Sequence, residues 1–154
     1  MSKLIILSGI SNSGKSSFTA TTVQHNPERY VSVNRDKIRE LLYSYTEETI
    51  QEYYHRNDFN YLESQVTAVQ DNLINFWLKR DKDIIVDNTN LRVKYIKEFE
   101  KFGVPIEVIF FDVTLKEALT RNMGRKRKVD EKIIENQYSQ YIELRKNYES
   151  KDIK

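Results

Sequence analysis

The sequence has 154 residues, with 31% charged side chains, 39% hydrophobic side chains and a formal net charge of +2. This length and balance are typical of one ordinary globular domain and argue against a disordered chain, but the charge is too mild to demonstrate a nucleic-acid partner. There is no cysteine, which excludes disulfides, thiol nucleophiles and cysteine zinc sites, and two histidines are too few for a His-rich metal site.

Four short apolar runs, separated by helical patterns, predict buried strands. The predicted strands cover residues 3–8, 30–33, 83–87 and 106–113. The predicted helices cover 15–24, a segment opening at 35, an amphipathic stretch around 62–77, residues 91–103 with Gly103 as the stop, and a final helix around 133–148. Strands that alternate with helices indicate an α/β fold with a small parallel sheet of about four strands, flanked by helices.

The chain shows no internal repeat, low-complexity segment or Pro/Gly/Ser linker, so we expect residues 1–154 to form a single domain. The apolar run "LIIL" near the N-terminus is far shorter than a membrane span or the core of a signal peptide. We therefore expect a cytoplasmic protein with no membrane partner.

The strongest motif is "GISNSGKS", Gly9 to Ser16, which matches G-x-x-x-x-G-K-[ST] directly after the first strand. In such a loop, backbone N–H groups at the start of a helix surround phosphate oxygens. Lys15 is expected to reach the β- and γ-phosphates of ATP, and the Ser16 hydroxyl to bind Mg²⁺. The other predicted contacts in the loop are Gly9, Ser11, Asn12, Ser13, Gly14 and Ser17.

A plain Gly/Ser turn is the alternative for this loop, but the apolar strand before it and the helical pattern after it are what the motif requires. A regulatory GTPase would also need an N-K-x-D guanine reader after a late strand, and the sequence has none.

The second strand runs into "NRDKIRE", which places Asp36 and Arg39 at the same edge of the sheet as the phosphate loop. Three residues apart on an opening helix, the two side chains should lie side by side. Asp36 is a candidate base for an attacking hydroxyl, and the alternative is a helix N-terminal acid paired with Arg39. Arg35 and Lys37 are interpreted as solvated or generally electrostatic residues.

The third strand ends at Asp87, followed by "NTNL". An acid at this place commonly holds Mg²⁺ through water, so Asp87 is a candidate metal residue beside Ser16. Alternatively this segment caps a helix starting near Leu91, with Asn90 well placed as the cap.

The run "TRNMGRKRK", 120–128, is basic, and in isolation it is a solvated surface as readily as a site. In a kinase, however, a mobile lid carries arginines that neutralise the triphosphate, and Arg121 and Arg125 would share one helical face. The tyrosines at 43, 45, 53, 54 and 61 could stack on bases, but packing is the favoured interpretation.

With these pieces in order, the chain resembles the 5′-kinase domain of polynucleotide kinases of the phage and animal end-healing type. The resemblance covers nearly the whole chain and is carried by "GISNSGKSS", "VNRDKIR", "VDNTNL" and "FFDVTLKEALTRNMGRKRKV". It implies a P-loop kinase fold with an Arg-bearing lid, ATP and Mg²⁺ as cofactors, and DNA or RNA 5′ ends as partners.

The resemblance also implies a role for each matching residue. Asp36 would be the general base, Arg39 would hold the phosphate next to the 5′-hydroxyl, and Arg121 and Arg125 would bind ATP phosphates. The segment containing Asn88 and Thr89 would contribute to acceptor binding. The phage branch has its acid where this chain has Asn88, which leaves three roles for Asp87: supporting Arg39, holding metal-bound water, or orienting the loop.

Larger members of that family carry a 3′-phosphatase domain with a D-x-D-x-T motif after an apolar strand. Asp81 and Asp83 precede their strand and lack the threonine, so we expect no phosphatase activity. Two other functions stay open: a P-loop kinase for a nucleoside, sugar or antibiotic alcohol, and a nucleotide-dependent binding module without transfer chemistry.

Overall fold

The computed structural model describes residues 2–45, 49–125 and 128–152. These residues contain a single sheet of four strands: β1 (Leu4–Ser8), β2 (Tyr30–Val33), β3 (Asp83–Val86) and β4 (Ile106–Phe110). Their order is β2-β3-β1-β4, and each neighbouring pair is parallel, with Ile6 opposite Val86 and Val108. The predicted four-stranded parallel sheet is confirmed, although the last two strands end earlier than predicted, at Val86 and Phe110.

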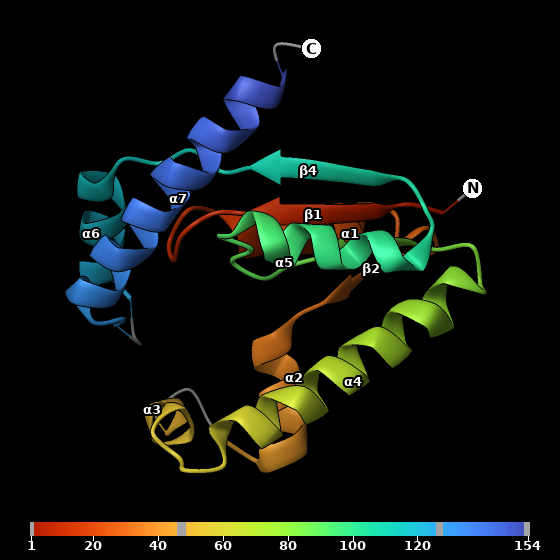
Figure 1. The fold of residues 1–154 in the computed structure, drawn as a ribbon, viewed down its shortest axis with the longest axis horizontal. Coiled ribbons are helices and arrows are strands. Elements are labelled where there is room, and N and C mark those ends of the chain that lie inside the picture. The colour runs from red at the N-terminus through yellow and green to blue at the C-terminus, as the bar shows by residue number, and fades with distance from the viewer. Residues whose placement is uncertain (1, 46–48, 126–127, 153–154) are drawn as a thin grey trace.

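Helices flank the sheet on both faces and at its carboxyl edge (Figure 1). Their bounds are α1 (Lys15–His25), α2 (Arg35–Tyr43), α3 (Ile50–Tyr54), α4 (Phe59–Leu78), α5 (Val93–Lys97), α6 (Leu115–Met123) and α7 (Glu131–Asp152). In Figure 1, α5 lies in front of the sheet and α1 behind it, while α6 lies beyond the carboxyl end of β1. The α2, α3 and α4 helices form an arm below the β2 edge.

The central strand β1 is buried along its whole length because both faces of the sheet are covered. Leu4 and Ile6 belong to a core cluster with residues of α4, α5 and α7. Ile5 and Leu7 point to the other face, where they pack with Phe18 and other residues of α1. A continuous apolar run, rather than an alternating one, is therefore what this strand requires.

The helix predicted over 91–103 is divided in the structure. It begins only at Val93, and after α5 the chain tightens into the 3₁₀ helix η1 (Glu98–Phe102). Gly103 ends it as predicted, in the left-handed region with φ 68°. The predicted capping role of Asn90 is wrong, because Arg92 precedes α5 and the Asn90 amide donates instead to the backbone oxygen of Leu7, 2.7 Å away.

The start of α2 is attached to the end of β3. Asn34 caps α2 by accepting a hydrogen bond from the Lys37 N–H at 3.0 Å. The amide nitrogen of Asn34 donates to the backbone oxygen of Asp87 at 2.9 Å. Because carboxyl ends of parallel strands meet at one edge, the first turn of α2 is held at the same edge as the loop that follows β1.

Candidate active site at the carboxyl edge of the sheet

The loop of residues 9–16 joins β1 directly to α1. A Cβ on Gly9 would lie 2.6 Å from Ser13 Oγ and 2.9 Å from Phe111 Cβ, so the backbone packs too closely there for a side chain. Gly14 precedes α1 with φ 103°, and no described side chain caps that helix. The first N–H groups of α1 are thus directed to the loop, which is the arrangement of an anion-binding helix N-terminus.

Lys15 lies buried inside this loop. Its ammonium donates to the backbone oxygen of Ile10 at 2.9 Å and to Ser13 Oγ at 3.4 Å. Burial lowers the pKa of Lys15 to about 8, although the carboxylates of Asp87 and Asp36 act in the opposite direction. Both acids are thus close enough to Lys15 to affect its charge.

A cavity of about 560 Å³ lies over the loop. All of its lining residues are among the predicted ATP contacts: Asn12, Ser13, Gly14, Lys15, Ser16, Ser17, Arg121 and Arg125. Gly9 is at the base of the loop instead. The Ser11 N–H donates to Gln137 Oε1 of α7 at 2.9 Å, a contact that sequence patterns did not indicate.

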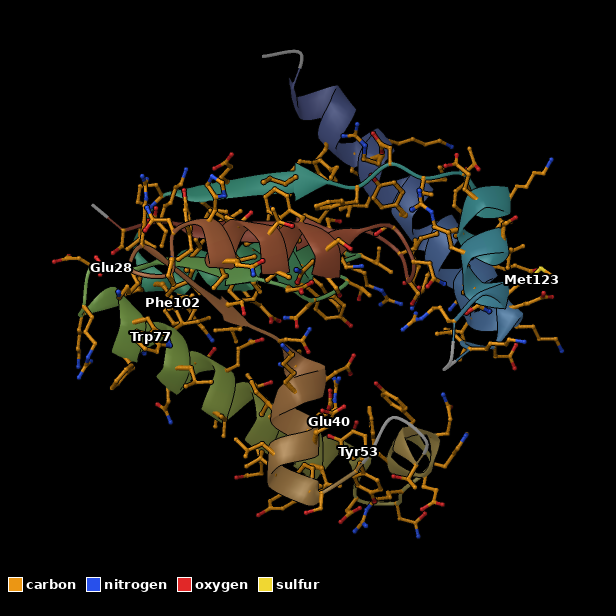
Figure 2. The ribbon with its side chains drawn as sticks, turned by 180° about the vertical axis from the view of Figure 1, so that it is seen from behind. Glu28, Glu40, Tyr53, Trp77, Phe102 and Met123 are labelled. Carbon is orange, nitrogen blue, oxygen red and sulfur yellow. The ribbon has the colours of Figure 1, made fainter. Side chains whose placement is uncertain are left out.

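The predicted lid arginines close over this cavity from α6 and the residues after it. Arg121 donates to the backbone oxygen of Asn12 at 2.9 Å, and Arg125 donates to Asn12 Oδ1 at 2.8 Å. Asn12 itself has φ 68°, in the left-handed region that asparagine tolerates. Figure 2 shows α6, marked by Met123, apart from α2 and α3, which are marked by Glu40 and Tyr53. Lys126 and Arg127 of the predicted basic run lie outside the described residues.

Asp36 and Arg39 pair on α2 as their spacing predicted. Arg39 Nη1 donates to Asp36 Oδ1 at 2.6 Å. The Asp36 side chain is 56% exposed and the Arg39 side chain only 10%. The acid is therefore accessible to an incoming group, while the guanidinium is held within the protein.

The structure adds a residue that sequence reasoning missed, Glu63 of α4. Its carboxylate accepts two hydrogen bonds from Arg39, from Nε at 2.9 Å and Nη2 at 2.7 Å. The Tyr53 hydroxyl also donates to it, and Arg35 Nη2 lies 3.3 Å away. Burial alone would raise the pKa of Glu63, but the bonds from Arg39 and Tyr53 lower it to about 2.

Glu63 changes the interpretation of one neighbouring residue, Arg35. Arg35 is not simply solvated, because its side chain is 21% exposed and ion-paired with Glu63. Lys37 is exposed, as interpreted. Packing is the correct interpretation for Tyr53, which is fully buried in α3 (Figure 2), whereas Tyr61 is 65% exposed.

The segment of residues 87–90 lies between the loop and α2 and bonds to both. On the loop side, the Gly9 N–H donates to the backbone oxygen of Thr89 at 3.0 Å, and Ser8 Oγ donates to the backbone oxygen of Asn90 at 2.9 Å. On the α2 side, Asn88 Oδ1 accepts from the Arg35 N–H at 2.9 Å, and its amide donates to Gln70 at 3.1 Å.

Asp87 is buried, and burial raises its pKa, while Lys15 and Lys37 act to lower it. The described carboxylates paired with Arg39 are Asp36 and Glu63, and Asp87 is not among them. The charged group that affects the pKa of Asp87 most is Lys15, on the phosphate side of the site.

The residues present fit a magnesium ion shared with phosphates. No group of three or more His, Cys, Asp or Glu side chains in the described part of the chain could hold a metal by itself. Mg²⁺ at phosphate sites usually needs fewer protein ligands than that, because phosphates and waters supply most of its coordination. The Ser16 hydroxyl in the cavity lining and the Asp87 carboxylate are oxygen donors of the kind that it prefers.

The parallel sheet, the phosphate loop and the arginine-bearing helix together define a kinase-type P-loop fold. A P-loop domain of this type implies nucleotide binding. A family model described as an AAA domain matches residues 4–145, and the chain belongs to that family.

Three solved structures resemble the chain. A chain from "Structure of the Pnkp1/Rnl/Hen1 RNA repair complex" has a TM-score of 0.77 and 21% identity, and the match covers 95% of this chain. A chain from "Structure of Pnkp1/Rnl/Hen1 complex" has a TM-score of 0.63, 25% identity and 84% coverage. A gluconokinase from Sinorhizobium meliloti 1021 has a TM-score of 0.59, 15% identity and 90% coverage.

The matches cover 46% and 43% of the two repair-complex chains and 74% of the gluconokinase. This chain therefore spans about half the length of the first two relatives. The resemblance to polynucleotide kinase domains that the motifs indicated is supported at the level of the fold. In the described residues, no helix has the length and apolar character needed to cross a membrane.

We expect Gly9→Ala to weaken ATP binding by about tenfold, because the new Cβ must displace the loop. The Ser13 hydroxyl can rotate away, but Phe111 Cβ, 2.9 Å from the added atom, cannot. Isothermal titration calorimetry with ATP would measure the loss. Gly103→Ala is the matched control: it is strained by its positive φ but far from the cavity, so it should lower stability and leave ATP affinity unchanged.

We expect ATP binding to take up protons at alkaline pH. Free Lys15, with a pKa of about 8, is partly neutral at pH 8.5, and the bound triphosphate stabilises its charged form. Calorimetry in buffers of different ionisation enthalpy should show uptake of roughly 0.7 proton per ATP at pH 8.5 and far less from this group at pH 7. Lys15→Arg does not titrate in this range and should abolish the uptake; uptake that persists in this variant would contradict the assignment.

Proposed function

We propose that the chain transfers the γ-phosphate of ATP to the 5′-hydroxyl of a DNA or RNA end, as a single domain that acts in end repair in the cytoplasm. The observation that carries the proposal is the Asp36–Arg39 pair, an exposed acid bonded to a buried arginine at the edge where Lys15 lies. A kinase for a charged acceptor needs these two groups, a base for the hydroxyl and a cation for the neighbouring phosphate.

In this proposal, Asp36 accepts the proton of the attacking 5′-hydroxyl. Among the described contacts, one oxygen of its carboxylate is bonded to Arg39, and the other oxygen would accept the proton of the hydroxyl. The 5′ oxygen forms a bond to the γ-phosphorus while the bond from that phosphorus to the β–γ bridging oxygen breaks, and ADP leaves. Arg39 binds the acceptor phosphate, with the segment containing Asn88 and Thr89 next to it.

On the donor side, the loop from Gly9 to Ser17 surrounds the phosphates, and Lys15 neutralises charge at the β- and γ-phosphates. Arg121 and Arg125 leave Asn12 and bind the triphosphate as the lid closes. Mg²⁺, when bound, neutralises the β- and γ-oxygens. Ser16 would hold the ion directly, and Asp87 would hold it through water.

A kinase for a small alcohol is the second candidate. It is favoured by the gluconokinase among the similar folds, since the loop, the base and the lid would serve any hydroxyl acceptor. The repair-complex chains support the nucleic-acid acceptor, because they match with higher TM-scores. A binding module without transfer is opposed by the exposed carboxylate of Asp36, whose charge acts on Lys15 and which nucleotide binding alone does not require.

We predict that label from γ-labelled ATP with Mg²⁺ will appear on 5′-hydroxyl DNA or RNA oligonucleotides. The same assay should include nucleosides, nucleoside 3′-monophosphates, gluconate and other sugars. Label found only on sugars or free nucleosides would favour the small-alcohol kinase. ATP binding without transfer to any of these acceptors would favour the binding module.

For the base, Asp36→Asn should lower kcat by about 10²- to 10⁴-fold, because the amide cannot accept the proton. ATP affinity should change little, since Asp36 lies on the acceptor side. Asp71→Asn is the matched control, as Asp71 forms a surface ion pair with Lys101 away from the site. Near-normal turnover of Asp36→Asn would assign Asp36 to the alternative role, a helix N-terminal acid.

A further inference from the structure

We propose that Glu63 is a positioning residue that sets the guanidinium of Arg39 to receive the phosphate next to the acceptor hydroxyl. The inference rests on the proposed function and identifies the group that gives Arg39 its orientation. Supporting Arg39 was one of the three roles left open for Asp87 by the sequence, and the contacts in the structure point to a different element, α4.

The Arg39 guanidinium has five N–H groups that can donate hydrogen bonds. Glu63 takes Nε and one N–H of Nη2 in a bidentate pair, and Asp36 takes one N–H of Nη1. Among the described contacts, two N–H groups are left, one on each terminal nitrogen. Because the guanidinium is planar and is fixed along its Nε and Nη2 side, these two donors lie in a fixed plane, and in this inference they bind the phosphate oxygens.

Burial of the Arg39 side chain holds its guanidinium in this orientation. The Arg39 side chain is 10% exposed, and its Cζ lies 5.7 Å from the ring centre of Tyr53 and 5.6 Å from that of Tyr54. The pKa of Arg39 is raised because pairing with Glu63 outweighs burial, so the charge is kept. Glu63, with its pKa near 2, is charged over the same range of pH.

Glu63 is itself held in place. The hydroxyl of the fully buried Tyr53 donates to the carboxylate oxygen that also accepts from Arg39 Nε. Arg35 approaches the other oxygen. The carboxylate thus joins α2, α3 and α4, and the position of Arg39 depends on all three helices. Asn88, where the phage branch carries an acid, is engaged with Gln70 and the Arg35 backbone and offers Arg39 no charge.

The test compares two acceptors that differ at one group. One is a 5′-hydroxyl oligonucleotide with an ordinary first phosphodiester, and the other has a neutral methylphosphonate at that linkage. Glu63→Gln keeps the size of the side chain but removes the charge. We expect KM for the phosphodiester acceptor to rise by about tenfold, and KM for the methylphosphonate acceptor to change by less than about twofold.

A double-mutant comparison separates positioning from a merely structural role. In the Arg39→Ala background, Glu63→Gln should not further reduce discrimination between the two acceptors, because there is no guanidinium left to orient. ATP affinity should be unchanged in Glu63→Gln. Glu107→Gln, which removes a surface acid paired with Lys3, is the matched control and should behave as wild type with both acceptors.

Equal KM increases with both acceptors, or no increase with either, would overturn the inference. If Glu63→Gln does not fold, Tyr53→Phe replaces it, since it removes only the hydroxyl that holds Glu63. That variant should show a smaller loss, about threefold, confined to the phosphodiester acceptor, and an equal loss with both acceptors would overturn the inference. Wild-type protein that phosphorylates neither oligonucleotide would instead refute the proposed function.

Discussion

The segment of residues 87–90 is the constraint on which the arrangement of the site depends. It hydrogen-bonds to the end of β1 and the first glycine of the phosphate loop through Thr89 and Asn90, and to the first turn of α2 through Asp87 and Asn88. Apart from Thr89, which is exposed, the residues that make these bonds are buried or half-buried, and they lie at the carboxyl edge of a sheet whose central strands are fully buried. The loop that binds phosphate and the helix that carries Asp36 are therefore held at a fixed separation by short polar contacts.

Charge at this edge is arranged in two separate groups. Among the described residues, the hydrogen-bond partners of the buried Lys15 are a backbone oxygen and a hydroxyl, so burial lowers its pKa and a bound anion would stabilise its charged form. Arg39 is buried with two carboxylate partners, so its charge is stable and its direction is set. The difference follows from what each cation must do in the proposed transfer. A lysine in a phosphate loop acts as a point charge, whereas an arginine whose planar guanidinium donates to two oxygens of a phosphate must be oriented.

The parts that could be predicted from sequence are those in which a short stretch of chain decides the structure. The parallel sheet follows from four apolar runs, the phosphate loop from one contiguous motif, and the Asp36–Arg39 pair from a spacing of three. Glu63 could not be found, because it lies 24 positions beyond Arg39 on another helix, at the edge of the buried face of α4, and no short spacing in the sequence links the two residues. Asn90 was assigned to the wrong partner for a related reason: its amide bonds to a strand 83 positions away. Side-chain contacts between distant elements leave no periodic signal in the sequence.

The docking of Arg121 and Arg125 on Asn12 has a consequence for how the protein responds to ligands. Both arginines already donate to one neutral residue of the loop. The free energy that they contribute to binding a ligand is therefore only the difference between their hydrogen bonds to the ligand and their hydrogen bonds to Asn12. Charged phosphate oxygens accept more strongly than a backbone carbonyl or an amide oxygen, while a nucleoside without phosphates offers no such advantage. In the proposed transfer, the contact would therefore act as a threshold: the arginines would exchange Asn12 for a polyphosphate and would stay on the loop in the presence of weaker acceptors.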